Sequence, residues 1–222
     1  DDQGVPNVSS GGIHYNNKWK NKVSLNTNYK AGYIRVNGLV STMYQNNIPN
    51  RQINTDASQN FDKNLFRQKL DFVYEIIVDT TLTLRASFNG IAKKSNIATS
   101  YLTTSNRSNG TILNNSYRDI NNSADEGNYN FSLLALKKLH KKGRTLSLNI
   151  VNNFNNQATD GILNSSNKFF DLNQQINSEL NVNQQKTNYF STNVYSSNFS
   201  YTEPLSKVSS LIVSYNLGLN TG

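Results

Sequence analysis

Short runs of alternating apolar and polar residues recur along the chain and meet in pairs at tight polar turns. Residues 80–89 carry apolar side chains at every second position, with polar side chains between them: Leu82, Leu84, Ala86 and Phe88. Residues 144–154 repeat the pattern with a second apolar set: Leu146, Leu148, Ile150 and Phe154. Because successive side chains of a β-strand point to opposite faces, this period of two predicts strands with one apolar face and one polar face.

Four tight connections, at residues 20–22, 79–80, 141–143 and 202–206, each lie between two such runs. The runs that flank them predict about eight antiparallel strands, paired as hairpins in chain order. Their expected ranges are 12–19 and 23–40, 65–78 and 81–91, 129–139 and 144–154, and 189–201 and 206–220.

The composition indicates what covers the apolar faces. The chain has 222 residues, of which only 36% are hydrophobic, and its mean hydropathy is -0.62. A soluble sandwich of this length needs a larger apolar supply for two inner faces. A sheet with lipid on one side and water on the other needs no packed core, so the pattern favours an all-β, up-and-down transmembrane β-barrel. No apolar run approaches the roughly 18 residues of a spanning helix.

Three long excursions separate the predicted hairpins, at residues 45–60, 103–127 and 155–187. They are rich in Asn, Ser, Thr, Asp and Gly and show no sustained period. We interpret them either as long loops or as strand extensions beyond the membrane. Tight turns on one side and long loops on the other are typical of outer-membrane barrels.

The cost of exposing charge to lipid predicts which face of each strand points outward. In residues 65–78 the odd positions include Arg67, Lys69, Asp71 and Glu75, so the even positions must face lipid, because each Arg or Lys costs about 2–4 kcal/mol at mid-membrane. The same reasoning predicts nine lipid-facing residues in three other strands: Leu82, Leu84, Phe88, Leu146, Leu148, Ile150, Leu211, Val213 and Leu217.

The predicted strand at residues 23–40 changes its apolar face partway along. Val23, Leu25, Tyr29 and Tyr33 share one face, whereas the apolar side chains that follow, Ile34, Val36 and Val40, lie on the other. A β-bulge near Gly32 would produce this change, as would a far part that lies above the bilayer.

Aromatic residues near the turns predict an interfacial belt at the level of the lipid headgroups. Trp19 precedes the first turn, Tyr74 the second and Tyr201 the fourth. Since Tyr and Trp are also common in soluble strands, each single position fits both explanations about equally.

The net charge of +8 has three explanations, namely solvated turn lysines, contact with lipid headgroups, or nucleic-acid binding, in that order of preference. The densest cluster lies at one turn, where aromatic side chains do not interleave with it as in nucleic-acid binders. It comprises Lys137, Lys138, Lys141, Lys142 and Arg144. The absence of cysteine excludes disulfides and thiolate metal sites.

The histidines and carboxylates of the sequence do not form a pattern typical of an enzyme. His14 and His140 are the two histidines, and neither lies in a pattern typical of a catalytic triad. Asp119, Asp125 and Glu126 share one excursion but lack the spacing of a calcium loop. We therefore expect no catalytic residues, no cofactor and no metal site.

Three segments resemble a known family. Residues 11–19 (GGIHYNNKW) resemble its GGLNYNDKW type of opening strand, residues 141–149 (KKGRTLSLN) its KKGRTLSLN hairpin, and residues 201–207 (YTEPLSK) its YTEPLGK turn. Together, in this order, they resemble the outer-membrane β-barrels of TonB-dependent-receptor-like proteins.

The resemblance implies a larger protein with a plug domain, a barrel of about 22 strands and a TonB-type energising complex as partner. The chain would then be an arc of the barrel wall, with the plug and the remaining strands missing, in a receptor that binds and takes up a ligand across the outer membrane. An isolated arc leaves two unpaired sheet edges, so we expect a fragment. The alternatives are a complete eight-stranded barrel serving as anchor or adhesin, and a secreted β-rich protein that binds carbohydrate.

Overall fold

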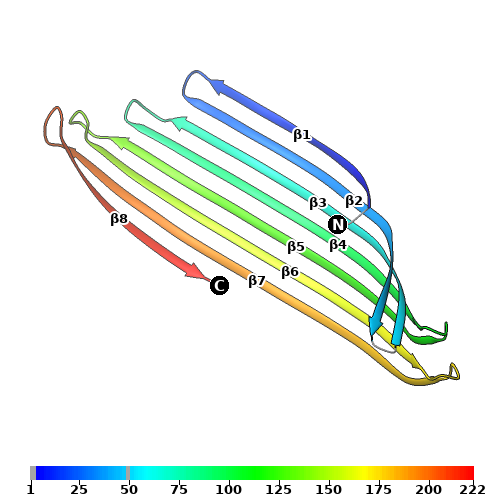
Figure 1. The fold of residues 1–222 in the computed structure, drawn as a ribbon. Coiled ribbons are helices and arrows are strands. Elements are labelled where there is room, and N and C mark those ends of the chain that lie inside the picture. The colour runs from blue at the N-terminus through cyan, green and yellow to red at the C-terminus, as the bar shows by residue number, and fades with distance from the viewer. Residues whose placement is uncertain (1–3, 49–50) are drawn as a thin grey trace.

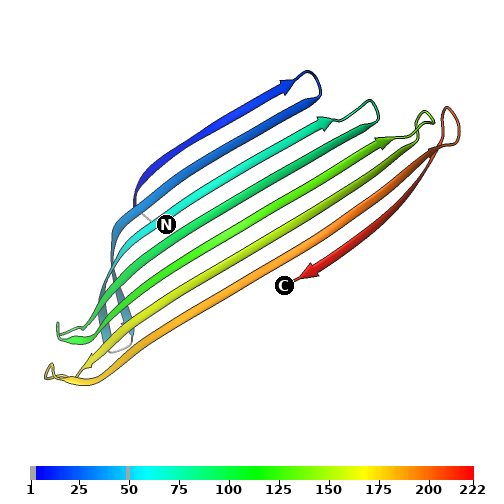
Figure 2. The same ribbon diagram turned by 180° about the vertical axis from the view of Figure 1, so that it is seen from behind.

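The computed structural model describes residues 4–48 and 51–222, and it consists of a single antiparallel sheet. Eight strands lie side by side in chain order, each hydrogen-bonded to its neighbours in the sequence (Figures 1 and 2). The all-β, up-and-down arrangement is thus confirmed. The strands are β1 (Val5–Trp19), β2 (Val23–Ile48), β3 (Arg51–Ile77), β4 (Leu82–Arg107), β5 (Ile112–Lys138), β6 (Thr145–Phe170), β7 (Ile176–Pro204) and β8 (Ser210–Thr221).

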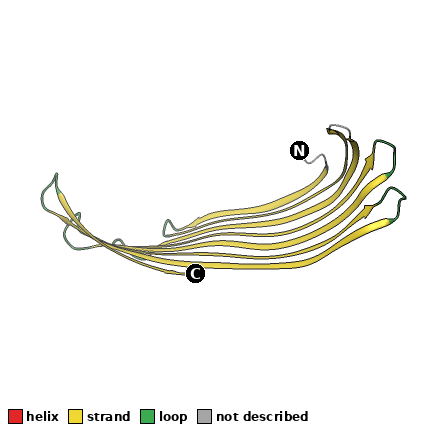
Figure 3. Ribbon diagram, turned by 60° about the horizontal axis from the view of Figure 1, so that its bottom comes forward, coloured by secondary structure: helices red, strands yellow, loops and turns green. Residues whose placement is uncertain are grey.

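The sheet forms one curved layer, with no second layer on either face (Figure 3). Among the described residues, Phe61 is the one buried hydrophobic side chain. The described part of the chain contains no helix that is long and apolar enough to cross a membrane. Strands β1 and β8 are the two edges and do not pair with each other, whereas a complete eight-stranded barrel requires that pairing. The described strands therefore form an open arc.

At the end of the sheet that holds the four tight turns, the strand boundaries at the first three turns agree closely with those predicted from the alternation. The fourth turn was predicted at residues 202–206, but β7 extends to Pro204 and β8 begins at Ser210, so this connection is residues 205–209. The first turn lies between Trp19 and Val23, where Lys20 and Asn21 adopt positive φ angles of 45° and 54°. Gly143, with a φ of 86°, lies in the third turn. A left-handed conformation costs glycine little, so this residue suits the short connection from β5 to β6.

At the opposite end, the expectation of long loops is wrong. The excursions are strand extensions, the second of the two interpretations, and they end in connections of residues 108–111 and 171–175. In the excursion at 45–60, residues 49 and 50 lie outside the described part. Backbone hydrogen bonds hold these extensions together whatever their side chains are. Where both faces are polar, the sequence carries no alternation that could reveal the strands.

A bulge near Gly32, the first of the two explanations for the change of face in β2, is also wrong. The pairing of β2 with β1 and with β3 runs through Gly32 without a shift, opposite Ser10 on one side and Arg67 on the other. Register shifts occur instead at two hairpin tips, between Ser105 and Asn106 and between Phe169 and Phe170. The apolar side chains of β2 therefore change face within a regular strand.

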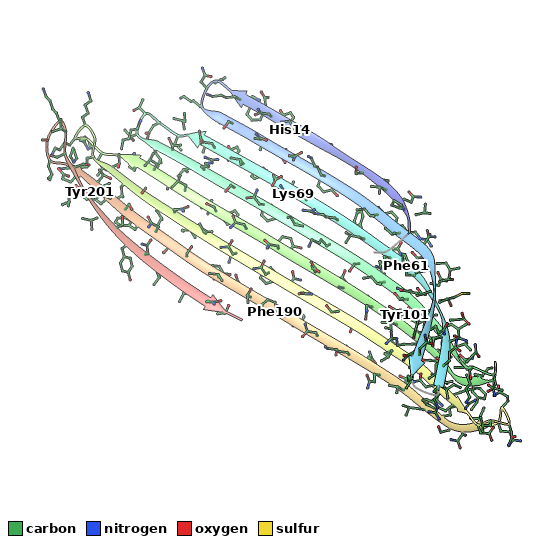
Figure 4. All side chains as sticks on the ribbon, viewed as in Figure 1. His14, Phe61, Lys69, Tyr101, Phe190 and Tyr201 are labelled. Carbon is green, nitrogen blue, oxygen red and sulfur yellow. The ribbon has the colours of Figure 1, made fainter. Side chains whose placement is uncertain are left out.

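A local cluster explains the apolar residues on the second face of β2. The extensions of β2 and β3 bend sharply, although β3 stays paired with β4 along its length, and Phe61 lies at this bend (Figures 1 and 4). Phe61 is paired with Gly38, so Val36, two residues earlier on β2, shares its face. The backbone of Gly4 approaches both side chains so closely that a Cβ there would lie 2.7 Å from Val36 Cγ1 and 3.0 Å from Phe61 Cε2. Val36 and Phe61 thus form a small packed corner on that face, whereas Ile34 is 38% exposed.

Candidate functional site

Continuous register across the sheet brings apolar residues of successive strands into single rows. One row joins six strands, and each of its residues is paired with the next: Ile76, Leu84, Ala135, Leu148, Phe199 and Tyr215. Because every pairing is direct, all six side chains lie on the same face. The alternation seen in separate segments is therefore a property of the whole sheet.

We call this surface the apolar band. It crosses all eight strands on the face that contains this row, and it includes the nine residues predicted to face lipid. Its members are Ile13, Tyr15 and Trp19 in β1; Val23, Leu25, Tyr29 and Tyr33 in β2; Phe66, Leu70, Phe72, Tyr74 and Ile76 in β3; Leu82, Leu84, Ala86 and Phe88 in β4; Tyr129, Phe131, Leu133 and Ala135 in β5; Leu146, Leu148, Ile150 and Phe154 in β6; Tyr189, Tyr195, Phe199 and Tyr201 in β7; and Leu211, Val213, Tyr215, Leu217 and Leu219 in β8.

No part of the described chain covers the apolar band. Leu148, in the middle of the sheet, is 39% exposed, and Val213 on the edge strand is 56% exposed. The largest apolar patch of a soluble monomer is typically a few hundred Å², much less than a face that spans eight strands. The band therefore requires an apolar environment outside the described chain.

The three aromatic residues predicted for an interfacial belt lie on this face. Trp19 is the last residue of β1, Tyr74 lies three positions before the end of β3, and Tyr201 lies near the end of β7. A second group of aromatic side chains lies toward the strand extensions and includes Tyr33, which is paired with Phe66. Sequence reasoning missed this second group, because without the register the depth of each strand was unknown.

Ion pairs lie at the border of the apolar band near the four turns. Glu203 accepts two hydrogen bonds from Arg144, at 2.7 and 2.9 Å, and one from Lys141 Nζ at 2.6 Å. Arg144 first, and then Lys141, hold the pKa of the Glu203 carboxyl well below its usual range. This carboxylate therefore stays ionised and joins the connection from β5 to β6 with the end of β7.

Two further ion pairs lie at the opposite border of the apolar band, toward the strand extensions. Arg35 Nη2 lies 2.6 Å from Asp62 Oδ2, and Lys94 Nζ lies 3.8 Å from Asp125 Oδ1. Hydrogen bonding to Arg35 lowers the pKa of Asp62, and the same contact raises the pKa of Arg35. These four side chains share the face of the apolar band. Arg35 and Asp62 lie beyond the row of Tyr33 and Phe66, whereas Lys94 and Asp125 continue that row into β4 and β5, where charge replaces apolar surface.

The distance between the two borders agrees with the hydrocarbon thickness of an outer membrane. In β3 the apolar band extends from Phe66 to Ile76, about 34 Å along a strand that rises ~3.4 Å per residue. A strand tilt of about 45° projects this length to roughly 25 Å, the height of the apolar zone of outer-membrane barrels.

The opposite face carries polar side chains that bond across the strands. Asn89 Nδ2 donates to Asp71 Oδ1 at 2.9 Å, and Asn130 donates to Asn153. Closer to the turns, Asn198 donates to Asn216, and the hydroxyls of Ser200 and Ser214 lie 2.7 Å apart. Such ladders satisfy amide groups that point into water, so this face is suited to an aqueous space.

Charged residues of the polar face are partly paired. Lys69 contacts Asp71 at 3.0 Å, and Lys93 contacts Glu126 at 3.0 Å. Further along, the guanidinium of Arg118 lies 4.5 Å from the centre of the Tyr101 ring, a cation–π contact that the alternation did not reveal.

The remaining candidate residues are dispersed. His14 lies on the polar face opposite Asn28, while His140 lies in the connection between β5 and β6. Asp119 and Asp125 share the face of the apolar band, whereas Glu126 lies on the polar face. In residues 4–48 and 51–222, no group of His, Cys, Asp or Glu is placed to hold a metal ion.

No family model matches the sequence. No curated protein matches it either. Among solved structures, the RagAB peptide transporter aligns over 96% of this chain with 10% identity and a TM-score of 0.43, and the RagAB peptide importer in its "open-open" state does so with 10% identity and a TM-score of 0.45. The closed form of the ferric-catecholate import receptor Fiu from K12 E. coli aligns over 90%, with 8% identity and a TM-score of 0.18.

The chain spans only part of these proteins, covering 32% and 31% of the two RagAB chains and 50% of the Fiu chain. The functional proposal below rests on the apolar and polar faces of the sheet and not on these structural similarities.

Proposed function

We propose that this chain forms an arc of the wall of an outer-membrane β-barrel, in a receptor that takes up a ligand. The observation that carries the proposal is the exposed apolar band, which crosses eight strands, ends at ion pairs on both sides and is backed by a mostly polar face. Hydrocarbon on one side and water on the other satisfy both faces without any further protein layer.

The polar face would then line the lumen, and the strand extensions would rise above the membrane to meet the ligand outside. The three segments that resemble TonB-dependent-receptor-like barrels, at residues 11–19, 141–149 and 201–207, support uptake as the activity of the whole protein. On this proposal, the partners are outer-membrane lipid, a plug and further strands of the same protein, and a TonB-type energising complex. The open edges of β1 and β8 are where further strands would pair.

Cell fractionation tests the location. The full-length protein should sediment with the outer membrane, and its band should shift on a gel after boiling, because folded barrels resist detergent and migrate faster than the unfolded chain. Recovery in a soluble fraction, with no shift on boiling, would refute the proposal. Such a result would favour the secreted β-rich binding protein.

A further inference from the structure

The end of the sheet with the four tight turns is strongly cationic. Five lysines in or next to the connections have side chains without a hydrogen-bond or ion-pair partner among the described residues: Lys20, Lys22, Lys138, Lys142 and Lys207. Two carboxylates next to the connections, Asp79 and Glu203, are already bound by Lys137, Lys141 and Arg144, and Glu75, near the end of β3, lies opposite Arg85 of β4. Positive charge therefore remains in excess there, and it points into solvent.

The opposite end differs in charge. Its described connections, residues 108–111 and 171–175, contain no lysine or arginine. The neighbouring Arg107 donates hydrogen bonds to the carbonyl oxygens of Phe170, Asp171 and Ile112, at 2.5, 3.2 and 2.6 Å. Its guanidinium group is therefore bound to the protein backbone. The excess charge is thus a feature of one border of the apolar band and not of the chain in general.

Apolar side chains lie among the unpartnered lysines. In the connection between β7 and β8, Leu205 is 65% exposed and Val208 is 96% exposed, on either side of Lys207. An exposed aliphatic group beside a cation, at the edge of an apolar surface, fits the boundary between acyl chains and headgroups. Trp19, at the end of β1, lies beside the connection that holds Lys20 and Lys22.

We propose that these turn lysines form a binding surface for the anionic headgroups of phospholipids in the leaflet that surrounds the turns. The proposal rests on the proposed membrane location of the apolar band. A lysine at the edge of that band lays its aliphatic stem along apolar surface and extends its ammonium group to the phosphate level. Each cation near an anionic membrane surface adds to the attraction, and the five lysines have no carboxylate partner that would compete.

Lipid that co-purifies with the full-length protein measures this binding. The folded protein is incubated in micelles that contain equal amounts of phosphatidylglycerol and phosphatidylcholine, and the retained lipids are quantified by mass spectrometry. We expect the wild-type protein to retain phosphatidylglycerol in several-fold excess, and the excess to fall as salt is raised from 0.05 to 0.5 M, since the Debye length shrinks from roughly 14 to 4 Å.

A triple variant, K20Q/K142Q/K207Q, removes one unpartnered lysine from each of three turns and should lower the excess at least threefold. A matched variant, K30Q/K168Q/K186Q, removes the same charge away from the turns and should keep it. A wild-type protein that shifts on boiling but retains the two lipids equally overturns the lysine proposal alone. Equal loss in both variants also overturns it, because net charge would then explain the binding. A protein that is not folded in the membrane refutes the proposed function and this proposal together.

Discussion

The ring of Tyr129 lies over the backbone of Gly127, two residues earlier on β5. A Cβ at Gly127 would lie closest to Asn156 Oδ1 of β6, and it would also lie 2.6 Å from Tyr129 Cε2 and 2.9 Å from the Tyr129 hydroxyl oxygen, closer than real Cβ atoms approach. The same ring stacks between Phe88 of β4 and Phe154 of β6, with centroids 6.4 and 6.1 Å apart. Gly127 thus leaves the space in which an aromatic side chain lies flat and joins three strands on the apolar band.

Replacing Gly127 with alanine should destabilise the sheet. The new methyl group must displace both the Asn156 amide and the Tyr129 ring, and moving the ring disturbs its two stacked contacts. Overpacking of this kind typically costs about 1–3 kcal/mol. Urea titration of the full-length protein in lipid vesicles, followed by Trp fluorescence, measures the change as a lower midpoint of unfolding.

Gly11→Ala is the matched control, because Gly11 also lies on the face of the apolar band and has no atom within 4 Å of the position a Cβ would take. It should leave the midpoint nearly unchanged. Equal effects of the two substitutions would show that the space left by Gly127 beside Tyr129 and Asn156 contributes nothing to stability.

A charge placed in the middle of the apolar band tests which face meets lipid. Leu148→Arg puts a guanidinium on the apolar face, where we expect a cost of about 2–4 kcal/mol in a membrane. Ser147→Arg changes the neighbouring position, which points to the polar face, and should be tolerated. The folding yield of each variant in lipid vesicles is measured from the gel shift on boiling, and Leu148→Arg should give the lower yield. A similar yield for both variants would contradict the assignment of the two faces.

Much of the architecture could be predicted from the sequence because strands with two unlike faces leave a period of two. That Leu82, Leu148 and Val213 belong to the apolar faces of their strands follows from the chemistry of their immediate neighbours, and the register places all three on one face of the sheet. The turns could be located for the same reason, since the alternation stops where both sides of the chain meet water.

The strand extensions could not be predicted, because the alternation disappears where both faces are polar. In residues 114–123, for example, Asn and Ser occupy both faces of β5, although all of them pair with β6. The burial of Phe61 in its packed corner could not be predicted either, for a related reason. Its partners Val36 and Gly38 lie on the preceding strand β2, well before Phe61 in the sequence, so no local pattern around Phe61 indicates that this one side chain is buried.

Phe61→Ala should lower the free energy of unfolding by about 3 kcal/mol, because it removes a fully buried ring and leaves a cavity against Val36 and Gly4. Chemical denaturation of the full-length protein gives the value. Phe190→Ala is the control: that ring is 53% exposed, so its removal should cost well under half as much. Comparable losses would mean that the corner at Phe61 does not help to hold the bent extensions of β2 and β3.

Acid should weaken the second turn in a narrow range of pH. Asp79 accepts hydrogen bonds from the Thr81 hydroxyl and amide, both at 2.6 Å, and from the Leu82 amide at 2.9 Å, and these contacts lower its pKa from 3.8 to about 2. Because the folded protein holds the charged form more tightly than the unfolded chain does, this stabilisation is complete above about pH 5. It is lost as the pH falls from about 4 to about 2.

The wild-type protein should therefore have a higher urea midpoint than Asp79→Asn at pH 6, where the carboxylate binds its donors more strongly than a neutral amide does. The difference between the two proteins should shrink between pH 4 and pH 2, since protonation gives the wild-type carboxyl the same neutral charge as the amide. A difference that stays constant down to pH 2 would mean that Asp79 contributes through the shape of its side chain and not through its charge.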